Sequence, residues 1–114
     1  MKITRFEDIQ AWKKAGKLTV SIYKTLEGCK DWAFRDQIQR ASVSVMNNIS
    51  EGFERKTNND FKYFLFIAKG SCGEVRSMLY LAKSLSYIDK DQFGQLLTMC
   101  LEISKMISGL IKTL

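Results

Sequence analysis

The chain has 114 residues, 46% of them hydrophobic and 26% charged, a size and composition typical of one globular domain. It has no proline and 7 glycines, which excludes collagen-like, linker-like and disordered chains. It also has no histidine, which excludes every catalytic triad, general base and metal site that depends on an imidazole. The 18 Lys and Arg against 12 Asp and Glu leave a net charge of +6, which favours anionic partners.

The cysteines and the apolar runs argue against several classes of protein. Cys29, Cys72 and Cys100 are odd in number and form no Cys-x-x-Cys pair, which excludes a disulfide framework or a four-cysteine zinc site within one chain. The first residues lack the apolar core of a signal peptide, and the longest compact apolar run is far shorter than a membrane span. We therefore expect a cytoplasmic protein with no cofactor, no metal and no membrane contact.

Four segments with helical periodicity are separated by three short breaks. Apolar residues recur at spacings of three and four and nowhere alternate over a sustained stretch, so the sequence predicts helices and no strands. Side chains suited to capping a helix start stand before each segment: Thr4 (with Glu7), Asp31, Thr57 (with Asp60) and Asp89 (with Gln92). The predicted helices cover about 6–27, 32–55, 58–86 and 90–112 of a single domain, 1–114. Short connections between long helices predict an all-α, antiparallel up-down-up-down four-helix bundle.

The first predicted helix has two candidate apolar stripes and a line of cations. Ile9, Trp12, Gly16, Val20 and Tyr23 form its main predicted core stripe, with Ala11, Ala15, Leu18 and Ile22 beside it. Its cations Lys13, Lys17 and Lys24 are expected to point to water.

The second predicted helix pairs a core stripe with a polar stripe. Phe34, Ile38, Ala41, Val45, Ile49 and Gly52 recur at helical spacing and are expected in the core. A polar cluster is expected from Arg40, Ser44, Asn48 and Glu51, joined by Glu74 of the third helix. Glu74 lies among apolar residues, and Arg40 is its natural partner. These residue types favour a hydrogen-bond network between helices or subunits, and a ligand site is the alternative.

The third and fourth predicted helices carry more apolar surface than a lone bundle requires. Phe61, Leu65, Ala68, Cys72, Val75, Leu79 and Ala82 form one core stripe, and Phe93, Leu97, Cys100, Ile103, Ile107 and Ile111 form the other. Additional apolar residues stand at Tyr63, Ile67, Met78, Leu81, Leu85, Met99, Met106 and Leu110. A second subunit that covers this surface is the favoured explanation, so we expect a homo-oligomer. The alternative is that a large core, built around bulky side chains, takes up these apolar residues within one subunit.

Basic residues of the third predicted helix are regularly spaced. Lys62, Lys69, Arg76 and Lys83 follow one another at intervals of seven, flanked by Phe66 and Tyr80. Together with Lys13, Lys17 and Lys24, these four are the candidate nucleic-acid-binding residues, because such lines of cations can follow a phosphate backbone. A solvated helix face that binds nothing is the alternative. The chain has no glycine-rich phosphate loop or catalytic carboxylate pair, so no enzyme is expected.

Several ordered stretches resemble one family. They are 37–45 (QIQRASVSV), 48–53 (NISEGF) with Arg55, Asp60-Phe61, Phe64-Leu65, 68–71 (AKGS) with Glu74, and the opening 6–9 (FEDI) with Trp12. In these stretches the sequence resembles the 23S rRNA intervening-sequence proteins. That family is similar in turn to the accessory proteins of diversity-generating retroelements. Gln39 and Met46 depart from the Arg and Pro common in the family, so neither a second arginine nor a proline kink is expected there.

The resemblance implies an up-down four-helix bundle assembled as a ring-like homopentamer. It also implies a role with RNA or DNA, RNA first and ribosomal RNA among the candidates, without established catalysis. The alternative that it leaves open is an oligomeric scaffold for a protein partner, such as a reverse transcriptase.

Overall fold

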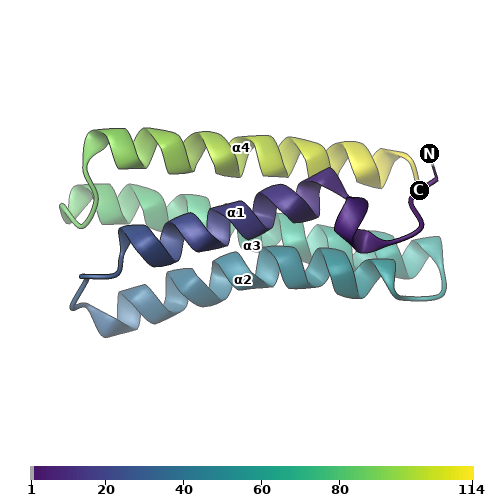
Figure 1. The fold of residues 1–114 in the computed structure, drawn as a ribbon, viewed down its shortest axis with the longest axis horizontal. Coiled ribbons are helices and arrows are strands. Elements are labelled where there is room, and N and C mark those ends of the chain that lie inside the picture. The colour runs from purple at the N-terminus through teal and green to yellow at the C-terminus, as the bar shows by residue number, and fades with distance from the viewer. Residues whose placement is uncertain (1) are drawn as a thin grey trace.

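The computed structural model describes residues 2–114, and in that part of the chain it contains four long helices and no strand. The elements are a short 3-10 helix η1 (Phe6–Asp8) and the α-helices α1 (Gln10–Thr25), α2 (Trp32–Phe53), α3 (Asn58–Ser84) and α4 (Lys90–Lys112). Figure 1 shows the four α-helices side by side along the long axis, with both ends of the chain at the same end of the molecule. The predicted all-α, four-helix architecture is confirmed.

Three of the four predicted helix starts are confirmed. The Asp31 carboxylate accepts a hydrogen bond from the Phe34 backbone N–H at 3.2 Å. The Thr57 hydroxyl oxygen accepts one from the backbone N–H of Asp60 at 3.1 Å. At the start of α4, Asp89 and Gln92 form a full capping box, in which each side chain accepts from the other residue's backbone N–H.

The fourth predicted start, Thr4, is wrong. The chain first makes η1, which no side chain caps, and Ile9 is extended (φ −74°, ψ 118°) before α1 begins at Gln10. The first helix is therefore shorter than the predicted 6–27, and a turn of different geometry precedes it. The Phe6 ring of this turn packs edge-on against Trp12 with 5.1 Å between ring centroids.

Each helix packs against two neighbours in a closed order. The helix pairs in contact are α1 with α2, α2 with α3, α3 with α4, and α4 with α1. Helices α1 and α3 therefore lie diagonally across the bundle from each other. As a result, the cations of α1 and those of α3 are presented on different sides of the subunit.

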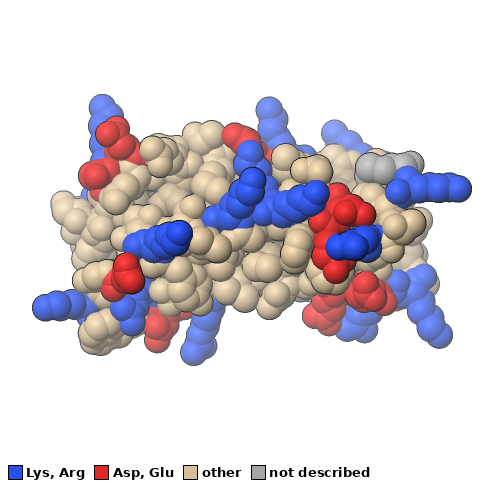
Figure 2. Space-filling model, viewed as in Figure 1, with Lys and Arg blue, Asp and Glu red and all other residues tan. Residues whose placement is uncertain are grey.

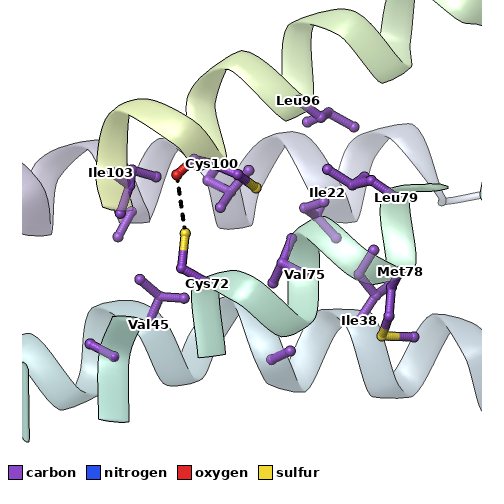
Figure 3. Packing of buried hydrophobic residues seen from close by; sticks show 14 of the residues in the cluster. Ile22, Ile38, Val45, Cys72, Val75, Met78, Leu79, Leu96, Cys100 and Ile103 are labelled. Atoms are coloured by element: carbon purple, nitrogen blue, oxygen red, sulfur yellow. Dashed lines mark hydrogen bonds between the residues drawn. The ribbon is translucent and has the colours of Figure 1, made fainter. Parts of the chain in front are cut away.

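The predicted core stripes of α2 and α3 are buried throughout. Ile38, Val45, Leu65, Val75 and Ile107 have no exposed surface. Figure 3 shows side chains from all four helices meeting in this core, with the Cys72 thiol donating a hydrogen bond to the Cys100 carbonyl oxygen at 3.3 Å. The neighbouring Cys72 thiol and burial raise the pKa of Cys100, so this cysteine stays protonated. Both cysteines act as small core residues, as predicted.

The predicted core stripe of the first helix is confirmed at Ile9 and wrong at Val20 and Tyr23. Ala11, Ala15, Leu18 and Ile22 are buried, whereas Val20 and Tyr23 of the favoured stripe are about half exposed. Both stripes have helical spacing, so periodicity alone could not choose between them. The stripe that begins with Ala11 and Ala15 faces inward, because these two small side chains let α1 pack closely on its neighbours.

No helix within residues 2–114 is both long enough and apolar enough to cross a bilayer.

Candidate nucleic-acid interface

Helix α3 presents two different surfaces outside the core. One is the basic ridge, formed by Lys62, Lys69, Arg76 and Lys83. The other is an apolar stripe in two parts, formed by the exposed side chains of Tyr63 and Ile67 and of Leu81 and Leu85. Gly70, Glu74 and Ser77 separate the two parts. Met78, which was expected in this second apolar set, is instead buried, because it lies closer to the α2 side of the core.

The two surfaces flank the core stripe of α3 on opposite sides. The ridge borders α4, since Lys69 and Arg76 line a hollow there together with Cys100 and Ser104. The α2 side is marked by two polar contacts, from Ser71 to Ser44 and from Glu74 to Gln37. A contact made through the apolar stripe would therefore leave the basic ridge open.

The four cations of the ridge are evenly spaced and unneutralised. At a rise of 1.5 Å per residue, they stand about 10.5 Å apart over a total of about 31 Å. Among residues 2–114, none of the four forms an ion pair with a carboxylate. Other cations do pair, as Lys14 does with Glu102 and Arg55 with Glu51. The positive charge of the ridge is thus available to an anionic ligand.

Between the cations lie two aromatic rings and one glycine. Phe66, Gly73 and Tyr80 alternate with the cations at steps of four and three residues, so all seven positions share one helical line. The Phe66 side chain is 57% exposed and Tyr80 is 54% exposed. At Gly73 the surface opens into the hollow between α3 and α4, which has a volume of about 110 Å³.

One end of the ridge is held against α4. The Tyr80 ring packs edge-on against the Phe93 ring, with centroids 5.1 Å apart and planes at 67°. The Lys83 ammonium lies 4.6 Å from the centroid of the same ring. Phe93 is buried at the start of α4, so a rigid residue positions both of these ridge side chains.

The predicted cations of α1 form a second, separate line. Lys13, Lys17 and Lys24 are exposed and, like the ridge, form no ion pair within the described chain. Figure 2 shows Lys and Arg side chains crossing the middle of the face over α1. Because α1 and α3 are diagonal, the structure does not bring the seven candidate residues into one site within a subunit.

The predicted polar cluster divides into separate contacts. Asn48 donates to the Ser44 carbonyl oxygen at 2.8 Å and lies 2.9 Å from the Ser44 hydroxyl, which is 2.9 Å from the Ser71 hydroxyl. These three side chains join α2 to α3. The predicted polar cluster did not include Ser71, although its position three residues before Glu74 is a signal that could have placed it on the same side of α3.

The expected pair between Arg40 and Glu74 does not form within the described chain. Glu74 accepts a hydrogen bond from the Gln37 side-chain amide at 3.3 Å. The Arg55 guanidinium, just past the end of α2, donates a hydrogen bond to the Glu51 carboxylate at 2.6 Å. Arg40 is exposed beside an open hollow that also borders Asn48. Gln37 stands one helical turn before Arg40 on α2. The side chain of Gln37, and not that of Arg40, reaches the Glu74 carboxylate.

The fold and the basic ridge define an all-α, four-helix protein with a line of unpaired cations on one helix. The family model for the 23S rRNA-intervening sequence protein matches residues 7–109. The chain therefore belongs to that family, and the resemblance seen in the sequence is confirmed.

A solved structure agrees with this assignment. The chain is similar to a crystal structure of a protein with unknown function from the S23 ribosomal protein family of Bacteroides thetaiotaomicron. The two have a TM-score of 0.84 and 28% sequence identity, over 90% of this chain and 98% of the other. No curated protein matches this chain.

Proposed function

We propose that this protein is a non-enzymatic, cytoplasmic homo-oligomer of antiparallel four-helix bundles that binds RNA through the basic ridge of α3. The observation that carries the proposal is the ridge itself, four evenly spaced cations without a carboxylate partner in the described chain. Membership of a family named for intervening sequences of 23S rRNA supports RNA as the ligand ahead of DNA.

Assembly is proposed through the apolar stripe of α3. Tyr63, Ile67, Leu81 and Leu85 form exposed apolar surface that a second subunit would remove from water. The stripe borders α2 and the ridge borders α4, so subunits joined by one leave the other free. The family resemblance implies five subunits in a ring, and we propose that number.

Oligomerisation supplies the affinity that one ridge lacks. Each phosphate that the protein neutralises adds about 0.9 to the slope of log affinity against log salt concentration on a duplex, and about 0.7 on a single strand. Four contacts from one subunit would bind RNA weakly at physiological salt. A ring repeats the ridge at fixed spacing, so further contacts become intramolecular once the first has formed.

The test is a titration of RNA affinity against salt concentration. The variant carrying Lys62→Glu, Lys69→Glu and Lys83→Glu should lose RNA binding at low salt while keeping its helix content and oligomer size. A matched control makes the same change of charge outside both lines of cations, at the exposed Lys30, Lys56 and Lys90. The control should bind within a fewfold of wild type. Coincident curves for wild type and the ridge variant would refute the proposal.

An interaction scaffold is the second candidate, and a hollow over α1 favours it. This hollow, of about 770 Å³, is lined mainly by apolar groups that include Trp12, Val20, Met46 and Met99. Flexible methionine side chains adapt to varied partner surfaces. If the ridge variant binds RNA as wild type does, and Val20→Asp removes a protein partner that is retained at high salt, the scaffold function is supported instead.

A further inference from the structure

We propose, building on the function above, that the basic ridge binds single-stranded RNA, with bases stacked on the rings of Phe66 and Tyr80. The phosphates of the same strand then meet the cations between and beyond these rings. The juxtaposition that carries this inference is the alternation of exposed rings with unpaired cations along one line of α3.

The core does not explain the two rings, and assembly does not explain Tyr80. Phe66 and Tyr80 are more than half exposed, and each stands three or four residues from the cations on both sides of it. Phe66 is also three residues from Tyr63, at the edge of the apolar stripe. Tyr80 has no stripe residue three or four positions away, so a subunit docked on the stripe would leave its ring in water. Exposed aromatic side chains among cations are the composition of surfaces that hold polynucleotides by stacking and charge together.

A duplex offers these rings no partner. Its bases are stacked inside the helix, and the major groove of A-form RNA is too deep and narrow for side chains to read. A duplex laid on the ridge would bring phosphates and ribose to the rings, and only the cations would gain contacts. A single strand exposes the faces of its bases, and every base has a face that can stack on an aromatic ring.

The order of side chains suits an extended strand. From Lys62 the ridge alternates cation and ring or glycine at steps of about 6 and 4.5 Å along the helix axis. Each ring therefore has a cation on both sides, about one side-chain length away. A base that stacks on Phe66 has its flanking phosphates near Lys62 and Lys69, and a base on Tyr80 has them near Arg76 and Lys83.

The platform at Tyr80 is already ordered without a ligand. Its ring is held edge-on against Phe93 at 5.1 Å, and Lys83 lies over the same Phe93 ring at 4.6 Å. Side chains that are fixed before binding lose less conformational entropy on binding. We therefore expect the stacking contribution of Tyr80 to be at least as large as that of Phe66.

The experiment compares two RNA probes by fluorescence anisotropy at about 50 mM salt. One probe is a labelled oligouridine of about 12 nucleotides, within the usual site size of such surfaces, and the other is a blunt RNA duplex of equal length. Phe66→Ala and Tyr80→Ala should each weaken oligouridine binding about tenfold. Duplex binding and the slope of affinity against salt should stay unchanged, since no cation is removed.

The chain offers matched controls. Trp32→Ala removes an aromatic ring outside both the ridge and the apolar stripe, where 58% of the side chain is exposed, and should leave oligouridine affinity unchanged. Phe66→Tyr and Tyr80→Phe keep a ring and should bind as wild type does. Because Tyr80 packs on Phe93, Tyr80→Leu serves in place of the alanine variant if circular dichroism shows lost helix.

The outcomes separate this inference from the proposed function. If wild type binds both probes equally and the ring variants bind as wild type does, stacking is refuted while RNA binding by the ridge stands. If wild type binds neither probe, or the triple lysine variant binds as wild type does, the proposed function itself fails. Weaker oligouridine binding by both ring variants, with intact duplex binding, establishes the inference.

Discussion

The carboxylate of Asp31 joins two loops that lie 56 residues apart in the sequence. One of its oxygens accepts a hydrogen bond from the backbone N–H of Phe34 and so caps α2. The other accepts a hydrogen bond from the Tyr87 hydroxyl at 2.6 Å. The Tyr87 ring also packs edge-on against Phe34, with centroids 5.3 Å apart. The α1–α2 and α3–α4 connections are thus fastened together at the end of the bundle away from the termini (Figure 1).

This contact predicts a dependence of stability on pH at both extremes. The Tyr87 hydroxyl, followed by the Phe34 N–H, lowers the pKa of Asp31 below its usual value, whereas Asp31 raises the pKa of Tyr87. The Asp31 contribution is present above the unfolded pKa of about 4 and is lost as pH falls through the lower folded value. The Tyr87 contribution is present below about pH 10 and is lost as pH rises through its raised value.

Tyr87→Phe isolates this contribution, because it removes only the hydroxyl. Urea unfolding of both proteins across pH should show the variant less stable by a constant amount between about pH 5 and 9. The difference should shrink on the acid side and on the alkaline side of that range. No histidine titrates in between to confuse the comparison. A stability difference that is the same at every pH would show that the hydrogen bond does not shift either group.

A serine in a left-handed conformation ends α3, and its replacement should stabilise the protein. Ser86 has φ 61°, and the backbone N–H groups of Ser86 and Tyr87 donate to the carbonyl oxygens of Lys83 and Ala82 in a Schellman motif. Glycine adopts this conformation without the steric cost that a Cβ brings. Ser86→Gly should raise the free energy of unfolding by about 0.5–1 kcal/mol. Chemical denaturation measures it, and an unchanged or lower value contradicts the account.

Gly52 lets α2 and α3 pack closely against each other at this position. A Cβ added there would lie 2.6 Å from the Phe64 Cβ and 3.3 Å from the Phe61 carbonyl oxygen, both fixed parts of α3. Gly52→Ala should therefore lower the free energy of unfolding by about 1–3 kcal/mol, because the helices must move apart. The matched control is Gly94→Ala on α4, where a Cβ meets nothing within 4 Å. That change should stabilise by up to about 1 kcal/mol through helix propensity, and equal effects of the two would be inconsistent with a clash.

Local signals in the sequence predicted most of the fold. Helix positions follow from apolar spacing and from caps such as Asp31, Thr57 and Asp89, whose partners lie within three residues. The core stripe of α3 was predictable because the rival stripe is interrupted by Gly70, Glu74 and Ser77. In α1 both stripes are apolar, so the choice depended on the packing of neighbouring helices, which spacing does not encode.

The candidate site was predictable to a smaller extent. The even spacing of Lys62, Lys69, Arg76 and Lys83 follows from the sequence alone, since a helix converts intervals of seven into a line. The contact of Tyr80 and Lys83 with Phe93 depends on how α4 is placed against α3, and nothing local reports it. The partner of Glu74 is likewise decided by the rotation of α2, which brings Gln37 to the carboxylate.

Assembly through the apolar stripe of α3 gives the last prediction. Ile67 and Leu81 are partly exposed apolar residues whose burial would contribute to association at about 25 cal/mol for each Å² removed from water. Light scattering of the wild type should report an oligomer, with five subunits as the expected number. The double variant Ile67→Glu, Leu81→Glu places two like charges on this surface and should give a folded monomer, because neither side chain fills the core of the subunit. Lys69→Glu alters the ridge of the same helix and should leave the oligomer intact. A stable monomer for wild type at micromolar concentration, or dissociation by Lys69→Glu alone, would contradict assembly through this stripe.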